Sequence, residues 1–96
     1  LRMRLPTISS YFPYSSKNYG ANSLRVSFGN LDLYYSYETV IAFRASGGLV
    51  IRKNDWSTTT GKHLNAINDD KSRRIDGSEF EKQLKEVLVK YNLSQE

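Results

Sequence analysis

The residues best suited to do chemistry lie close together in one polar stretch: Thr58, Thr59, Thr60, Lys62 and His63. At the start of a helix, hydroxyls, backbone N–H groups and an ammonium group can together bind an anion. The spacing is not that of a phosphate-binding P-loop, because Trp56 stands where the motif needs glycine and His63 where it needs Ser or Thr. The alternative, which we favour, is that these threonines cap the helix by satisfying its backbone donors.

A catalytic interpretation of the same stretch depends on His63, the one histidine of the chain. Ser57 or Thr58 could act as the nucleophile, but a triad also needs a carboxylate that orients the imidazole. The nearest aspartates, Asp55 and residues 69–70, follow no pattern that ties them to His63. We therefore expect a satisfied or solvent-facing histidine and no enzyme, with no ligand set for a metal and no cofactor.

The elements that would position these residues are four strands joined by three hairpins between Leu24 and Lys53. Side chains alternate faces along a strand, so only certain loop lengths place all the apolar side chains on one face. Gly29-Asn30 suits a two-residue turn that pairs Phe28 with Leu31. This register predicts an antiparallel meander with one apolar face.

The other two loops follow from the same alternation. Both are predicted to contain three residues, at positions 37–39 and 46–48. The first pairs Tyr35 with Ile41, and the second pairs Phe43 with Ile51. The second loop also has a glycine for the left-handed position that such a loop needs.

The opposite face of this sheet is predicted to be basic, partly aromatic and without an evident cover. Its side chains fall in two rows across the strands: Arg25, Tyr34, Ala42 and Arg52 in one, and Ser27, Asp32, Arg44 and Val50 in the next. Exposed aromatic rings on a sheet stack on bases, while Arg and Lys side chains bind phosphates. We therefore expect nucleic acid to bind here. The residues that would bind it are Arg25, Tyr34, Arg44 and Arg52, with help from Lys17, Tyr19 and Lys62.

The N-terminal part is predicted to contain an edge strand and a long loop. Residues 1–5 alternate between apolar and basic and precede Pro6, which favours a fifth strand at the sheet edge. Residues 7–23 are rich in Tyr, Ser, Asn and Gly, the composition of a loop. We favour a loop that covers the sheet edge or the outer face with aromatic side chains from Tyr11, Phe12 and Tyr14. The alternative is an adaptable binding loop.

A short helix is predicted after the sheet, at about residues 61–67. Thr60 would be its N-cap, and Leu64 and Ile67 would face inward. The mixed charges of residues 69–74 then indicate a solvated connector.

The C-terminal helix is predicted over residues 78–93. Ser78 and Glu81 have the spacing of a capping box at its start. Apolar residues then recur at helical spacing and form one stripe: Phe80, Leu84, Val87, Leu88 and Tyr91. This stripe must pack on the apolar face of the meander.

Composition sets the size and class of the fold. Ninety-six residues, 39% hydrophobic and 25% charged, make one domain with one modest core. The expected fold is α+β: a meander of four or five strands, a short helix, and the C-terminal helix on one face. Its parts are residues 1–23, 24–53, 54–77 and 78–93. The absence of cysteine excludes a disulfide scaffold. No apolar run approaches the roughly 18 residues that cross a membrane.

Three blocks of the sequence resemble a small uncharacterised domain of phage and other prokaryotic proteins. The blocks are Tyr19–Val26, Tyr34–Arg44 and Trp56–Asn65. The resemblance covers most of residues 19–68. It implies a phage or mobile-element protein in the host cytoplasm, and it implies no reaction, ligand or catalytic residue.

Two alternatives to nucleic-acid binding remain open at this point. One is a protein-binding module that inhibits or modulates a host protein through the Tyr-rich segment. The other is a binder of a phosphate-bearing small ligand at the Thr58–His63 turn. The net charge of +4 permits attraction to phosphate polymers but is also common in small proteins without such partners.

Overall fold

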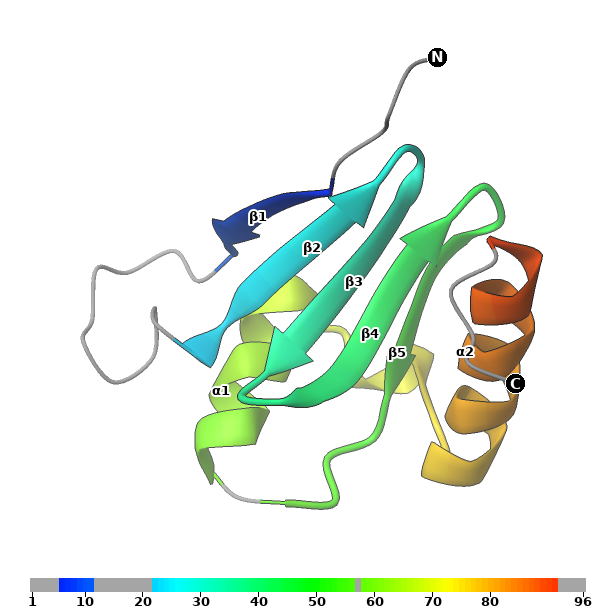
Figure 1. The fold of residues 1–96 in the computed structure, drawn as a ribbon. Helices are drawn as coiled ribbons and strands as arrows, with labels where there is room; N and C mark the ends of the chain where they lie inside the picture. The colour runs from blue at the N-terminus through cyan, green and yellow to red at the C-terminus, as the bar shows by residue number, and fades with distance from the viewer. Residues whose placement is uncertain (1–5, 12–21, 57, 92–96) are drawn as a thin grey trace, which may run out of the picture.

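The computed structural model of this protein describes residues 6–11, 22–56 and 58–91. These residues form one six-stranded sheet and two α-helices (Figure 1). The strands are β1 (Thr7–Ser10), β2 (Leu24–Phe28), β3 (Leu31–Ser36), β4 (Thr39–Ala45), β5 (Gly48–Arg52) and β6 (Arg74–Ile75). The helices are α1 (Thr58–Ile67) and α2 (Gly77–Lys90), with a 3₁₀ turn, η2 (Lys71–Arg73), before β6.

The α+β fold and the meander order are as the sequence predicts. The strands lie in chain order across the sheet, antiparallel from β1 to β5, and β6 is parallel to β5. Phe28 pairs with Leu31, and Leu33 pairs with Phe43, as the alternation of side chains requires. The glycine of the first turn, Gly29, takes a φ of +62°, which suits a tight hairpin.

The β3–β4 hairpin differs from the prediction. Its turn is Tyr37-Glu38, not three residues, so Tyr35 lies opposite Val40 instead of Ile41. The register shifts between Tyr34 and Tyr35, which is a β-bulge. The extra residue is Ile41, and it leaves Ile41 and Ala42 on the same side of the sheet, while Val40 and Phe43 lie on the other.

The β4–β5 hairpin also has a shorter turn than predicted. Ala45 pairs with Gly48, so Phe43 lies opposite Val50 instead of Ile51. A one-residue change in register exchanges the two faces of a strand. Arg52 therefore points to the α2 side of the sheet, where it contacts Phe80, and leaves the row in which it was predicted.

Both faces of the sheet are covered, each by one helix (Figure 1). On one face, Leu64 and Ile67 of α1 pack as predicted, in a cluster with Tyr34, Ile41, Ala42 and Ile51. On the other face, Phe80 of α2 packs with Leu31, Leu33 and Phe43. The rest of the predicted α2 stripe joins this second cluster: Leu84, Val87, Leu88 and Tyr91. The predicted single core is therefore wrong, and the outer face, for which the sequence indicates no helix, is covered by α1.

Both edge strands lie outside the positions predicted for strands. The edge strand β1 is Thr7–Ser10, within the predicted loop, whereas residues 1–5 lie outside the described part. The other edge, β6, falls at the end of the predicted connector, because Ile75 joins the α2-side cluster and Arg74 pairs with Ile51. None of the helices in the described part is long and apolar enough to cross a membrane.

The two helix starts also differ from prediction. Because α1 begins at Thr58, Thr60 lies in its first turn and is not the N-cap. Asp76 is the N-cap residue of α2, so Ser78 lies inside the helix and no capping box forms. Glu81 instead pairs with Arg52.

Candidate functional site

The residues predicted to bind nucleic acid do not form one exposed surface. Tyr34 and Arg52 are buried, and they lie on opposite faces of the sheet. Arg25 is half-buried and pairs with Tyr34 on the neighbouring strand. Its guanidinium group donates a hydrogen bond to Ser9 Oγ (3.4 Å). Arg44 is exposed. Lys17 and Tyr19 lie outside the described residues.

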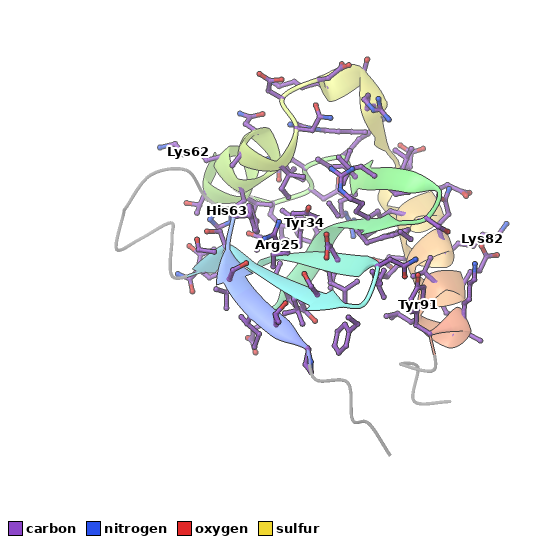
Figure 2. All side chains as sticks on the ribbon, turned by 90° about the horizontal axis from the view of Figure 1, so that it is seen from above. Arg25, Tyr34, Lys62, His63, Lys82 and Tyr91 are labelled. Carbon is purple, nitrogen blue, oxygen red and sulfur yellow. The ribbon has the colours of Figure 1, made fainter. Side chains whose placement is uncertain are left out.

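The residues of the predicted anion site point in different directions. They occupy the first two turns of α1, where Thr60 and His63 face the sheet and are buried. Lys62 is exposed and points outward from the helix (Figure 2). Thr59 is half-buried, and the side chain of Thr58 lies outside the described part. The ammonium group and the buried hydroxyl of this stretch therefore do not converge.

A buried hydrogen-bond network joins α1 to the end of β3. Ser36 Oγ lies 2.7 Å from His63 Nδ1 and 3.3 Å from Thr60 Oγ1. A serine–histidine contact of this length resembles a nucleophile and its base, but both side chains are buried. Sequence reasoning missed Ser36. The sequence feature that could have identified Ser36 is its position two residues after Tyr34 in the same strand. This spacing places both side chains on the face of the sheet that α1 covers.

Tyr11 extends this network, as predicted for an aromatic that covers the outer face. Its ring packs edge-on against Tyr34 and His63, with ring centroids 5.4 and 6.2 Å away. Its hydroxyl donates a hydrogen bond to the backbone oxygen of Tyr35 (2.7 Å). Burial, followed by the nearby Tyr34, raises the pKa of Tyr11 above its ordinary value. The other two aromatics of that prediction, Phe12 and Tyr14, lie outside the described residues.

A small pocket opens beside this network, at the end of the sheet. Its volume is about 170 Å³, and it is lined by Ser36, Tyr37, Thr39, Ile41, Trp56 and Thr60. Three of these residues are buried: Ile41, and the hydroxyl-bearing Ser36 and Thr60. By contrast, Tyr37 is 51% exposed and Trp56 is 49% exposed. The pocket therefore combines half-exposed rings with buried hydroxyls. We refer to it as the Tyr37–Trp56 pocket.

Both rings of the Tyr37–Trp56 pocket are held by neighbouring groups. The guanidinium carbon of Arg52 lies 4.5 Å from the centroid of the Trp56 ring. The ring of Tyr37 lies 5.9 Å from that of His63, and its backbone N–H donates to the backbone oxygen of Asn22 (2.8 Å). The backbone of Tyr37 has a φ of +56°, a left-handed conformation that is costly for such a side chain. The pocket is therefore pre-organised.

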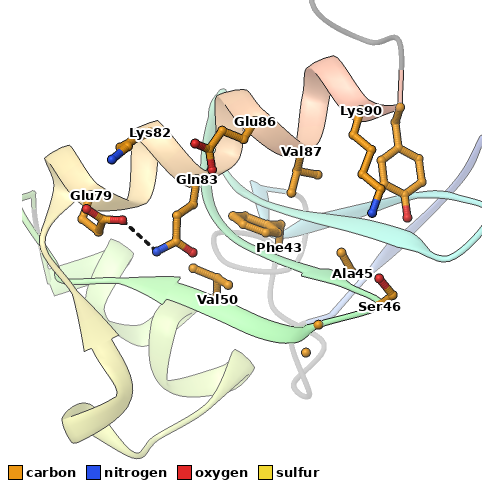
Figure 3. A pocket seen from close by; sticks show the side chains of 13 residues that line it. Phe43, Ala45, Ser46, Val50, Glu79, Lys82, Gln83, Glu86, Val87 and Lys90 are labelled. Carbon is orange, nitrogen blue, oxygen red and sulfur yellow. Dashed lines mark hydrogen bonds between the residues drawn. The ribbon is translucent and has the colours of Figure 1, made fainter.

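A larger groove lies between α2 and the β4–β5 hairpin (Figure 3). It has a volume of about 580 Å³, and Phe43, Val50 and Val87 contribute its apolar surface. Its charged lining residues are two lysines and two glutamates: Lys82, Lys90, Glu79 and Glu86. These balance in sign, so the groove has no charge preference. The Tyr37–Trp56 pocket is the more specific of the two, because it has buried polar groups.

No three His, Cys, Asp or Glu side chains in the described part are grouped so as to hold a metal ion. Neither a curated protein nor a solved structure matches the chain. Residues 7–82 match one protein family, described as "Family of unknown function (DUF8033)". That match spans most of the 96 residues. The chain therefore belongs to the DUF8033 family.

Proposed function

We propose that this protein is a non-catalytic binding module that recognises a protein partner through the Tyr37–Trp56 pocket. The observation that carries the proposal is the pair of half-exposed rings around buried hydroxyls. Tyr and Trp dominate binding energy at protein interfaces, because they offer large contact areas at a small cost in conformational entropy. Rings held in place before binding lose still less entropy.

The size of the pocket supports one inserted side chain as the ligand. Its volume of about 170 Å³ is below the roughly 300–1,000 Å³ of sites that enclose a whole small molecule. The rings of Tyr37 and Trp56 supply apolar surface, while Ser36 and Thr60 supply hydroxyls. An aromatic side chain with a polar edge would satisfy both kinds of surface.

The charges around the pocket favour a protein over a nucleic acid. Glu38 is exposed and adjoins Tyr37 in the sequence, and Arg52, the cation beside Trp56, already pairs with Asp55 and Glu81. A phosphate chain would therefore approach a carboxylate and a guanidinium group that two carboxylates neutralise. Nucleic acid on the predicted row of the sheet would have to displace α1 and Tyr11. The resemblance to phage domains makes a host protein in the cytoplasm the natural partner under this proposal.

Trp56 gives a direct assay, because it is the one tryptophan of the chain. Random peptides displayed on phage would be selected on the immobilised protein and counter-selected on Tyr37→Asn. Peptides specific for the parent should share one aromatic residue and should shift the Trp56 emission saturably when added as synthetic peptides. They should bind Tyr37→Asn at least about tenfold more weakly.

Val89→Asn is the matched control, since Val89 is also 51% exposed but lies on α2. Peptides that lose equal affinity with Val89→Asn, or that share no residue, would contradict the proposal. A single-stranded oligonucleotide that quenches Trp56 and weakens as salt rises would identify nucleic acid as the ligand instead.

A further inference from the structure

Arg52 is a buried arginine between two aromatic rings. Its side chain is 7% exposed, and its guanidinium carbon lies 4.5 Å from the Trp56 ring centroid and 5.5 Å from that of Phe80. Trp56 belongs to the Tyr37–Trp56 pocket and Phe80 belongs to α2. One side chain thus bridges a pocket residue and the helix on the α2 side of the sheet.

Two carboxylates fix the guanidinium group. Arg52 Nη2 lies 3.0 Å from Asp55 Oδ2, and Nη1 lies 3.3 Å from Glu81 Oε2. Arg52 Nε is buried and has no hydrogen-bond partner among the described residues. A buried arginine costs desolvation free energy, and an apolar side chain of similar size often serves stability as well or better. Core stability alone therefore gives no reason for an arginine here.

The start of α2 is shaped around the same group. A Cβ atom on Gly77, the first residue of α2, would collide with the Arg52 guanidinium. Glycine is a poor helix former, yet at this position it lets the helix approach the arginine closely. The start of α2 therefore lies against the guanidinium group, and the guanidinium group lies against the Trp56 ring.

We infer that Arg52 is a positioning residue that holds the Trp56 ring in place and couples α2 to the Tyr37–Trp56 pocket through Glu81. The effect on binding rests on the proposed function, but the effect on Trp56 does not, because Trp56 fluorescence is measured without a partner. A change at Glu81, on a helix outside the pocket, should therefore loosen the Trp56 ring.

The experiment compares three variants of the full chain: Arg52→Met, Glu81→Gln and Glu86→Gln. Met keeps apolar bulk between the two rings but loses the charge. Gln at position 81 removes one ion pair from a mostly exposed carboxylate, so this variant should fold even if Arg52→Met does not. Glu86→Gln, on an exposed position of the same helix, is the control. Far-ultraviolet circular dichroism and thermal melts establish that each variant is folded.

Acrylamide quenching and fluorescence anisotropy of Trp56 are the readouts. We expect Arg52→Met and Glu81→Gln to raise the quenching rate constant about twofold and to lower the anisotropy, and Glu86→Gln to change neither. Unchanged quenching in folded Glu81→Gln would overturn the inference, whatever the peptides do. If quenching rises in Arg52→Met and Glu81→Gln but the selection yields no peptide that binds the parent, the inference is upheld and the proposed function is refuted.

Discussion

Tyr37 has a backbone conformation that few side chains tolerate, and it lies beside the pocket. Its φ of +56° is in the left-handed region, which costs a side chain with a Cβ about 1–2 kcal/mol and which Asn and Gly adopt more readily. Strain of this kind clusters at binding sites, where surrounding contacts maintain it. Stability and recognition therefore favour different residues at this position.

We predict that Tyr37→Asn is at least as stable as the parent, with a free energy of unfolding higher by up to about 1 kcal/mol. Binding to the selected peptides should be lost in the same variant. Urea denaturation measures the first quantity and titration of Trp56 emission the second. Glu38→Asn, at the neighbouring turn residue, is the control for both. A loss of about 2 kcal/mol in Tyr37→Asn would show that its contact with His63 is needed for folding.

The buried hydroxyl of Tyr11 makes the stability of the fold depend on pH in the alkaline range. Burial raises the pKa of its hydroxyl in the folded state above the ordinary value of 10, which the unfolded chain retains. Above pH 10 the unfolded state therefore loses a proton that the folded state keeps, so the free energy of unfolding falls as pH rises. Below pH 10 this contribution to stability is fully present.

We predict that Tyr11→Phe loses about 1 kcal/mol at pH 7, because the hydrogen bond to the Tyr35 backbone oxygen is lost. Between pH 10 and 11, its stability should fall less steeply with pH than that of the parent. Urea denaturation at several pH values measures both effects. Equal slopes in the two proteins would mean that Tyr11 ionises freely in the folded state.

At the scale of elements, we expect a Gly→Ala substitution at the start of α2 to destabilise the fold, although such a substitution usually stabilises a helix. Replacing a helical Gly by Ala normally stabilises by about 1 kcal/mol. At Gly77 the added Cβ meets the Arg52 guanidinium, which two rings and two carboxylates hold in place. The collision should outweigh the gain in helix propensity.

We therefore predict that Gly77→Ala lowers the free energy of unfolding by about 1 kcal/mol or more, and that Arg52→Met in the same chain largely relieves the loss. A double-mutant cycle measured by urea denaturation tests this coupling. Gly47→Ala is the control, because a Cβ there meets no atom within 4 Å. Additive effects at positions 77 and 52 would contradict the predicted collision.

The sequence predicts the positions of strands and helices better than it predicts which side of the sheet each side chain faces. The predicted register of the first hairpin is confirmed, because Gly29-Asn30 specifies its turn locally. The prediction for the last hairpin is wrong because the predicted three-residue turn and the observed turn, Ser46-Gly47, both contain glycine. The choice between them depends on which residues of β5 are buried. Leu49 and Ile51 pack on the α1 side and Val50 on the α2 side, so alternation in β5 itself does not decide.

The candidate site was predicted only in part for the same reason. Thr60 and His63 are singled out by their types, but their partner Ser36 is found only when α1 is known to cover that face. Trp56 appears in the sequence merely as a residue that breaks a phosphate motif. Its position beside Tyr37 depends on the path of the chain from β5 to α1, which local patterns do not encode.

At the scale of the molecule, two helices enclose the sheet. Because α1 covers the outer face of the meander, Tyr34 is nearly as buried as Leu33. We predict that Tyr34→Ala and Leu33→Ala each lower the free energy of unfolding by about 2–5 kcal/mol, as core truncations do.

Arg44→Ala provides the exposed comparison on the Tyr34 side, and it should cost under about 0.5 kcal/mol. Urea denaturation of the three variants measures these differences. A silent Tyr34→Ala would mean that α1 does not pack on the sheet in solution.

The strand order also has a consequence for how the chain reaches this structure. Each strand from β2 to β5 pairs with its neighbour in the chain across a tight turn, so these contacts form early and fast. By contrast, β6 must close a loop of about twenty residues to reach β5. Trp56 and α1 lie inside that loop. The meander can therefore exist before the pocket does, and we expect recognition to appear only with the last step of folding.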